Sequence, residues 1–313
     1  MKKPNSLIFC MLFLLLLSCM ACGSEGDTLT PEQKRLQKIA QIDTTLHNFL
    51  QLETIEGYGQ LEGLSAEAWM LIDDSTGFVI SQKNADKKLF FASITKTMTC
   101  LLALENGNPS DTLCITDDVF IAKDSRVRLG DSYQLGNLIY EMMLVSDNDA
   151  AYAVAKHIGG DTLKFCDMMN QKALYLGMDS THFANPNGMP CNNNYSSAKD
   201  LVRLMRYCMC DSAFAEIVGT AEKDLPLTDG RHLPCLNTNQ LLTTYEGCLG
   251  IKTGFTRQAG NCLASAATRD GTTLYLVLLG SRSMTSRFKE SAILLDYGFN
   301  VMKAYREKVA AKP

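Results

Sequence analysis

The residues of this sequence best suited to covalent chemistry are Ser93 and Lys96, which lie just before an apolar run. At the start of a helix, this spacing places a hydroxyl and an amine on one helical face. A serine hydroxyl is protonated at neutral pH, so it needs a base within hydrogen-bond reach, and a desolvated lysine amine can serve. The pair predicts Ser93 as an acylating nucleophile and Lys96 as its base. The alternative is a solvated helix start that Ser93 caps.

A second motif, Ser146-Asp147-Asn148, lies between two stretches with helical spacing. A hydroxyl and an amide two residues apart on a loop can point into one cleft. There Ser146 would relay protons, and Asn148 would hold a peptide carbonyl or the catalytic lysine. The alternative for this motif is an Asx-type helix cap.

A third motif, Lys252-Thr253-Gly254, falls on a predicted strand. A lysine beside a small residue on an edge strand can bind a substrate carboxylate, and Gly254 would let the substrate backbone approach closely. The alternative is the solvent-facing end of a strand.

The elements that must position these motifs follow from hydrophobic periodicity. Residues 97–105 are apolar enough to form a buried helix, ended by Asn106-Gly107, with Ser93 at its N-terminus. Backbone N–H groups at that end favour developing negative charge. Apolar positions at helical spacing predict further helices at residues 138–144, 150–158, 162–176 and 197–207.

Strand patterns occur on both sides of this helical block. The expected strands are residues 68–72, 78–80, 248–253, 262–266 and 273–279, with turns at 73–77 and 269–271. Strands at both ends of a chain can pair in one sheet. We therefore expect an α+β fold with one antiparallel sheet, built from both chain ends, and an inserted helical subdomain.

Helical patterns also flank this predicted domain. Thr30-Pro31-Glu32-Gln33 carries the signature of a helix start, and apolar residues recur at helical spacing from Leu36 to Leu50. Residues 286–302 predict an amphipathic helix, followed by a short basic tail at 306–313.

The first residues have the pattern of an export signal. A basic start is followed by an apolar run at 7–17 that is too short for a comfortable membrane span. Leu16-Leu17-Ser18-Cys19 resembles a bacterial lipobox, with Cys22 as a poorer second candidate for lipidation and an ordinary secretory signal as the alternative. We expect four regions: a lipoprotein signal (1–22), a tether with an N-terminal helix (23–62), the main domain (63–305) and the tail.

Composition restricts the class of protein. The chain has 313 residues, 46% hydrophobic and 20% charged, with a formal net charge of −4. These values predict a soluble globular protein and give no sign of nucleic-acid binding. Nine of the twelve cysteines follow Cys22, and their apolar surroundings favour small buried thiols, with a disulfide or two left open. The four histidines stand in no ligand spacing, so we expect no metal, no cofactor and no Ser-His-Asp triad.

Together, the three motifs resemble those of the serine penicillin-recognising enzymes, namely Ser-x-x-Lys, Ser-x-Asn and Lys-Thr-Gly. Within that superfamily the chain looks most like the low-molecular-weight penicillin-binding proteins that are D-alanyl-D-alanine carboxypeptidases. The segments that carry this closer match are 92–96, 146–151, 176–178, 181–189, 238–242, 250–256 and 259–260. The match covers residues 66–299, nearly the whole predicted domain.

The resemblance implies a β-lactamase/transpeptidase-like fold and a role for each motif. Ser93 would attack the carbonyl between the last two D-alanines of a peptidoglycan stem peptide, with Lys96 accepting its proton. Lys252 with Thr253 would hold the terminal carboxylate, and the backbone N–H groups of Ser93 and Phe255 would form the oxyanion hole. β-Lactam antibiotics would acylate the same serine. The enzyme would act in the cell envelope, on the periplasmic or outer-surface side of a bacterial membrane that holds its N-terminal lipid.

The sequence departs from the family pattern at three points, and two alternative functions also share some of its features. Phe91 replaces the usual proline before Ala-Ser, Phe255 fills a place often polar in relatives, and the sequence ends soon after Phe299, without the second β domain and C-terminal anchor of many members. A class A β-lactamase shares the motifs, but it should carry Glu-x-x-Leu-Asn where this chain has residues 185–189. The other reading is a non-catalytic lipoprotein that binds cell-wall peptides or a partner.

Overall fold

The computed structural model describes residues 29–121 and 125–311. The predicted export signal and both candidate lipidation sites, Cys19 and Cys22, lie outside the described residues. The chain divides into two compact units, Met1–Lys34 and Arg35–Pro313. Among the described residues, no helix is both long and apolar enough to cross a membrane.

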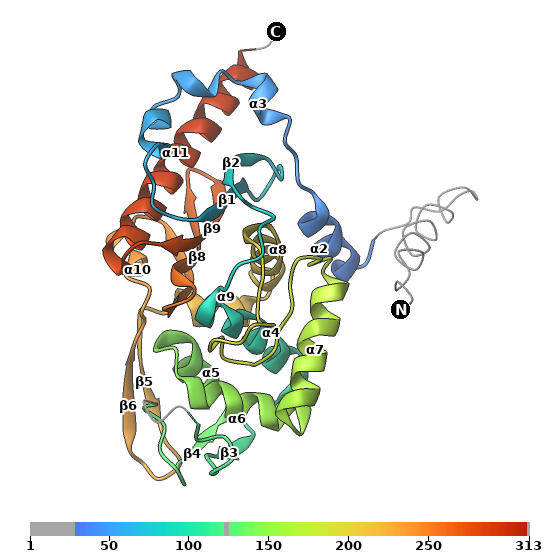
Figure 1. Ribbon diagram of the computed structural model, residues 1–313, viewed down its shortest axis with the longest axis vertical. Helices are drawn as coiled ribbons and strands as arrows, with labels where there is room; N and C mark the ends of the chain where they lie inside the picture. Colours follow the sequence, from blue (N-terminus) through green and yellow to red (C-terminus); the bar gives the residue numbers. More distant parts are fainter. Residues whose placement is uncertain (1–28, 122–124, 312–313) are drawn as a thin grey trace, which may run out of the picture. The chain divides into compact units, whose positions relative to one another are not determined.

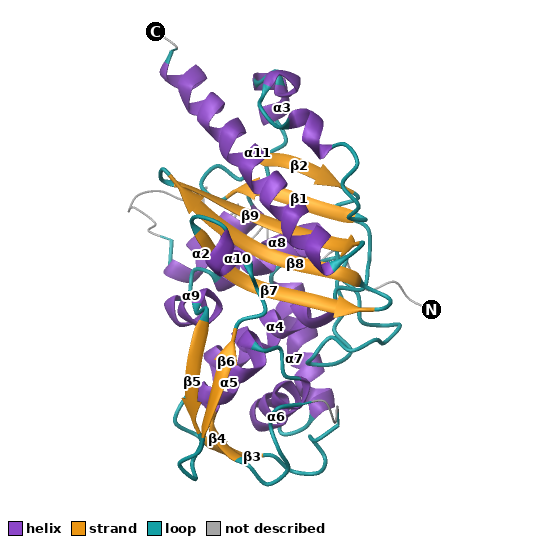
Figure 2. Cartoon of the chain, turned by 90° about the vertical axis from the view of Figure 1, so that its left-hand side faces the viewer, coloured by secondary structure: helices purple, strands orange, loops and turns teal. Residues whose placement is uncertain are grey.

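A five-stranded antiparallel sheet organises the larger unit (Figure 2). Its order is β2-β1-β9-β8-β7. The strands are β1 (Ala68–Asp73), β2 (Val79–Lys83), β7 (Cys248–Thr256), β8 (Gly260–Arg269) and β9 (Thr272–Ser281). Because β1 pairs with β9 along its whole length, the two ends of the domain meet in the middle of the sheet. The predicted α+β fold, with a sheet shared by both chain ends, is confirmed.

Helices cover both faces of this sheet (Figure 1). Successive strand residues point to opposite faces, so Trp69 and Leu71 pack with helix α11 (Met284–Ala310). Met70 and Ile72 pack on the other face, in the cluster that includes helix α8 (Ala198–Cys208). All six residues of β1 are buried for this reason.

The helical subdomain is inserted between β2 and β7, as the sequence predicts. Its helices are α4 (Lys96–Asn106), α5 (Leu135–Leu144), α6 (Asn148–Gly159), α7 (Thr162–Tyr175), α8 and α9 (Ser212–Gly219), with the short α10 (Leu241–Thr244) just before β7. Helix α4 contacts α5, α6, α7, α8 and α9, so its first eight residues are buried. The predicted boundaries of the four longer helices after α4 agree with these within three residues.

Three parts of the fold differ from the sequence expectation. The single helix expected up to Leu50 is two helices, α2 (Pro31–Ala40) and α3 (Leu46–Phe49), because the chain between them pairs with the sheet edge through Asp43 and Phe78. The expected tail is helical as far as Ala310. Short elements were not predicted: the helices α9 and α10, the strands β3 (Thr112–Cys114), β4 (Ser132–Gln134), β5 (Glu222–Pro226) and β6 (His232–Leu236), and the 3₁₀ turns η2 (Leu52–Thr54) and η3 (Tyr58–Leu61).

The nine cysteines of the described residues are free thiols. The predicted burial is right for five of them, Cys100, Cys166, Cys208, Cys235 and Cys262. It is wrong for the three exposed ones, Cys114, Cys191 and Cys210, which lie on a strand edge, in a loop and at a helix end.

Candidate active site

Ser93 lies in a 3₁₀ turn, η4 (Ala92–Thr95), that leads directly into α4. The preceding Ala92 has a φ of 50°, in the left-handed region that residues with a Cβ rarely adopt. Phe91 anchors this turn, because its fully buried ring packs edge to face on Phe183 at 5.9 Å between centroids. The serine therefore stands at the helix start, as predicted, on a turn fixed by packing.

Lys96 is the first residue of α4 and is fully buried. Its Nζ atom lies 2.9 Å from Ser93 Oγ, 2.8 Å from Asn148 Oδ1 and 2.8 Å from the Asn187 carbonyl oxygen. An uncharged amine can donate to the two Asn oxygens and direct its lone pair at the serine hydroxyl. This geometry suits a base that accepts the Ser93 proton.

The Ser146-Asp147-Asn148 motif forms the sharp turn before α6. Ser146 has a φ of 67°, and Asn148 is the first residue of the helix. Asp147 caps the helix by accepting from Ala150 N at 2.9 Å, and it also accepts from Ser125 Oγ at 2.6 Å. Within the described residues, the half-buried Ser146 hydroxyl has no hydrogen-bond partner, so it is available to relay a proton.

Lys252 lies on the edge strand β7 and is only 1% exposed. Burial lowers its pKa well below the ordinary lysine value, and the nearby charges of Lys96 and Arg287 lower it further. The side chain thus faces the protein interior beside Lys96, contrary to the alternative of a solvent-facing strand end. The neighbouring Thr253 hydroxyl is 2.7 Å from that of Thr238.

Gly254 brings β7 against the nucleophile turn. A Cβ atom at this position would lie 2.8 Å from the Phe91 carbonyl oxygen and 3.1 Å from Ser93 N, both too close for an ordinary contact. Only glycine fits here without a shift of backbone. The first and third motifs therefore touch through their backbones, while the first and second touch through Lys96 and Asn148.

The family model described as D-alanyl-D-alanine carboxypeptidase matches residues 58–283. The chain belongs to the D-alanyl-D-alanine carboxypeptidase family. Members of this family are serine hydrolases, and the resemblance read from the three motifs is thus confirmed.

Several relatives in the D-alanyl-D-alanine carboxypeptidase family are about equally similar to this chain. D-alanyl-D-alanine carboxypeptidase DacF of Bacillus subtilis is 31% identical over 242 residues, which cover 75% of this chain and 62% of DacF. The D-alanyl-D-alanine carboxypeptidase of Streptomyces sp. strain K15 is 32% identical over 255 residues, which cover 75% of this chain and 88% of the K15 protein. The crystal structure of the Streptomyces K15 DD-transpeptidase superposes with a TM-score of 0.72 at 30% identity, covering 75% of this chain and 97% of that one. The chain thus spans less than two thirds of DacF and most of the K15 protein.

Two groups beside the three family motifs were not singled out from the sequence. Arg287 on α11 is 5% exposed, and its Nη1 donates to the carbonyl oxygens of Gly254 (3.2 Å) and Cys262 (3.4 Å). Burial lowers its pKa to about 10, and no carboxylate of the described residues lies within ion-pair distance of it. Asn187 contributes a main-chain oxygen, whose role no side-chain pattern reveals. In sequence Arg287 resembles any polar residue of an amphipathic helix, so only its contact with the Gly254 carbonyl oxygen of β7 identifies it.

Proposed function

We propose that this chain is a serine-type D-alanyl-D-alanine carboxypeptidase that removes the terminal D-alanine of peptidoglycan stem peptides through an acyl-enzyme on Ser93. The observation that carries the proposal is the 2.9 Å approach of Lys96 Nζ to Ser93 Oγ. A serine at a helix start is the nucleophile in such a pair, and the buried lysine within its reach is the base. Family membership supplies the substrate class.

In acylation, Lys96 takes the Ser93 proton while Oγ forms a bond to the carbonyl carbon between the two D-alanines. The backbone N–H groups of Ser93 and Phe255 receive the resulting oxyanion, and each such donor is typically worth about 3 kcal/mol in the transition state. The C–N bond then breaks, and the leaving D-alanine amine takes a proton from Lys96 by way of Ser146. Asn148 keeps Lys96 in place and holds the peptide.

The terminal carboxylate of the substrate would bind at Lys252 and Thr253. The basic side chains of Lys252 and Arg287 are both buried, and no carboxylate among the described residues forms a salt bridge with either. An incoming carboxylate would supply the missing negative charge and restore the charged form of Lys252. The site therefore favours a peptide with a free C-terminus, which is the chemistry of a carboxypeptidase.

Deacylation by water would complete the cycle. In a class A β-lactamase a glutamate activates that water from the loop between the second and third motifs. Here residues 185–189 contain no carboxylate, and the Asn187 carbonyl oxygen of this loop instead accepts a hydrogen bond from Lys96. This observation favours slow release of a penicillin over rapid hydrolysis.

We also propose that the chain is exported and lipid-anchored. The proposal rests on the apolar run at 7–17 and the lipobox-like residues ending in Cys19. Residues 23–62 would then join the anchor to a catalytic domain at 63–305. An N-terminal lipid would hold the enzyme at the membrane surface, within reach of peptidoglycan.

The test is to label the purified chain with a fluorescent penicillin and then measure D-alanine release from a peptide ending in D-Ala-D-Ala. The proposal expects stable labelling and D-alanine release, both lost in Ser93→Ala. Rapid turnover of the antibiotic would favour the β-lactamase, and an unlabelled wild-type chain would favour a binding protein. Label retained by Ser93→Ala would refute the acyl-enzyme assignment. For the anchor, labelling by a radioactive fatty acid should depend on Cys19 or Cys22.

A further inference from the structure

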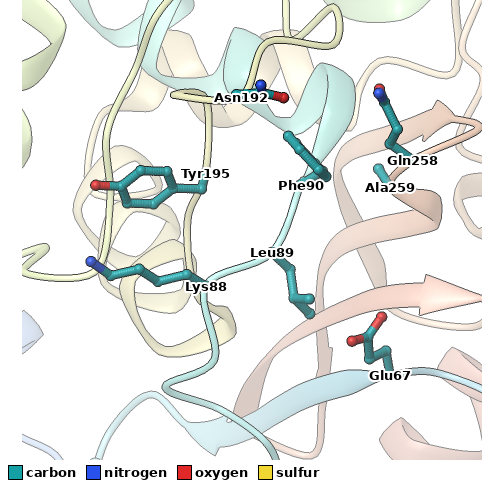
Figure 3. A pocket seen from close by; sticks show the side chains of 8 residues that line it. All are labelled: Glu67, Lys88, Leu89, Phe90, Asn192, Tyr195, Gln258 and Ala259. Atoms are coloured by element: carbon teal, nitrogen blue, oxygen red, sulfur yellow. The ribbon is translucent and has the colours of Figure 1, made fainter.

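A cavity of about 280 Å³ is lined by residues from the segments 88–90, 192–195 and 258–259 and by Glu67 (Figure 3). Three of the segments that line it continue directly from segments of the site. Phe90 precedes Ser93 by three residues, Gln258 follows Phe255 by three, and Asn192 follows Asn187 by five. Because these segments lie within five residues of the site along the chain, we expect the cavity close to the place of the substrate carbonyl.

The direction of β7 decides which part of a substrate would reach this cavity. Lys252 and Thr253, the proposed carboxylate site, precede Phe255, whose N–H is the proposed oxyanion donor. The departing D-alanine would thus lie toward the start of the strand. The retained part of the peptide must leave in the other direction, toward Gln258.

Chain lengths agree with this path. Three residues from Phe255 to Gln258 span at most about 10 Å. In an extended substrate, the residue before the penultimate D-alanine begins one residue further on, about 3.4 Å away. A side chain of four or five bonds adds about 6 Å more. The end of that side chain would therefore reach the cavity.

The lining of the cavity suits an aliphatic side chain with a positive end. Leu89, Phe90 and Ala259 provide apolar contacts, and the Glu67 carboxylate stands at one end (Figure 3). Glu67 pairs with Lys87 at 2.7 Å, but both side chains are about half exposed, and such a pair contributes little and exchanges easily.

The second lysine of this segment does not neutralise Glu67. The Nζ atom of Lys88 lies 4.8 Å from the centroid of the Tyr195 ring, and Figure 3 shows it turned toward that ring and away from Glu67. A ligand ammonium could therefore approach Glu67 without meeting the charge of Lys88 first.

We propose that this cavity is a subsite for the side chain of the stem-peptide residue that precedes the two D-alanines, and that Glu67 binds an ammonium group at its end. The inference rests on the proposed carboxypeptidase activity and extends it to substrate choice. The ligand class is a diamino-acid side chain with a free amine.

The test compares two peptides, Nα-acetyl-L-Lys-D-Ala-D-Ala and its Nε-acetylated form, which differ only in the free amine. Wild-type enzyme should release D-alanine from the first with about fivefold higher kcat/KM at low salt, the effect of one partly exposed ion pair, and less at high salt. In Glu67→Gln the ratio should fall to about one. Glu62→Gln, which removes an exposed carboxylate outside the cavity, should keep it.

The outcomes separate the subsite from the activity. Equal cleavage of both peptides by wild-type enzyme, or an unchanged ratio in Glu67→Gln, would overturn the subsite and leave the carboxypeptidase proposal standing. Cleavage of neither peptide would overturn the proposed activity and the subsite together. Lys87→Ala, which frees Glu67 from its surface partner, should raise the ratio.

Discussion

Gly188 packs so closely against Ala92 that a Cβ atom at residue 188 would overlap the Ala92 carbonyl oxygen. Gly188 also has a φ of 85°, so a side chain there is disfavoured by its own backbone as well. The contact fixes the loop 185–189 against the turn that carries Ser93. Since the neighbouring Asn187 supplies an oxygen to Lys96, the loop and the catalytic pair form one unit.

Gly188→Ala should therefore reduce acylation without removing any catalytic group. The loop must shift away from Ala92, and a base displaced by about 1 Å can cost about 10²-fold in rate. The measurement is the rate of penicillin labelling. Gly59→Ala is the control, because no residue other than its chain neighbours comes within 4 Å of the added methyl group, and it should label at the wild-type rate. Equal rates for both variants would mean that the loop does not position Lys96.

Lys252→Met should weaken binding of the substrate carboxylate without lowering the stability of the fold. The variant keeps the length of the side chain and removes a buried amine whose pKa burial already depresses. Loss of a charged hydrogen bond to the substrate carboxylate, about 1.5–3 kcal/mol, predicts a loss of about 10- to 100-fold in kcat/KM. Because the variant no longer buries a polar group in the core, its melting temperature should be equal to or above that of the wild type. Unchanged peptidase kinetics would place the carboxylate elsewhere.

The sequence predicts much of this site because each motif is local. The Ser93–Lys96 spacing, the helix after it and the strand with Lys252 follow from periodicity and residue chemistry alone. The sharing of one sheet by strands from both ends of the domain follows as well, since strand patterns flank the helical block. The Asp270-Gly271 turn between β8 and β9, with both φ values positive, is of the kind that a short-range hairpin signal predicts.

The remaining features depend on contacts between distant segments. Arg287 differs from an ordinary helix arginine only because its buried side chain reaches main-chain carbonyl oxygens of β7 and β8. Asp43 lies in a stretch with helical spacing, yet backbone pairing with Phe78 stops a helix there. Such tertiary contacts override local propensity, and one sequence gives no sign of them.

Asp147→Ala should lower activity through the position of Asn148. Asp147 lies between the two proposed catalytic residues of its motif, and its carboxylate holds the α6 start and the chain at Ser125. Loss of a helix cap costs about 1 kcal/mol, so the protein should fold with a modestly lower melting temperature. The rate of penicillin labelling should fall by more than the small decrease in folded protein explains. Asp147→Asn retains an acceptor for the cap and should recover most of both properties. Labelling that falls only in proportion to the folded fraction would reduce Asp147 to a structural cap.

The buried pair of Glu141 and Cys235 predicts how stability depends on pH. The thiol donates to Glu141 Oε2 at 2.6 Å, and the nearest cation, Arg126, is 3.9 Å away. Burial raises the pKa of Glu141 to about 7 from 4.5, and the charge of Asp147 adds to this. Between these values the native state retains a proton that the unfolded state has lost. The free energy of unfolding should therefore fall as pH rises from about 4.5 to about 7, by at most about 3 kcal/mol.

Glu141→Gln should remove this contribution, because an amide retains an acceptor for the Cys235 thiol and does not titrate. Denaturant unfolding at several pH values should give a flatter profile for the variant between about pH 4.5 and 7, with its largest gain over wild type above pH 7. Glu246→Gln, an exposed carboxylate, should leave the profile as it is. A profile of Glu141→Gln that parallels the wild type would show that Glu141 is ionised in the native protein throughout this range, with Arg126 as its effective partner.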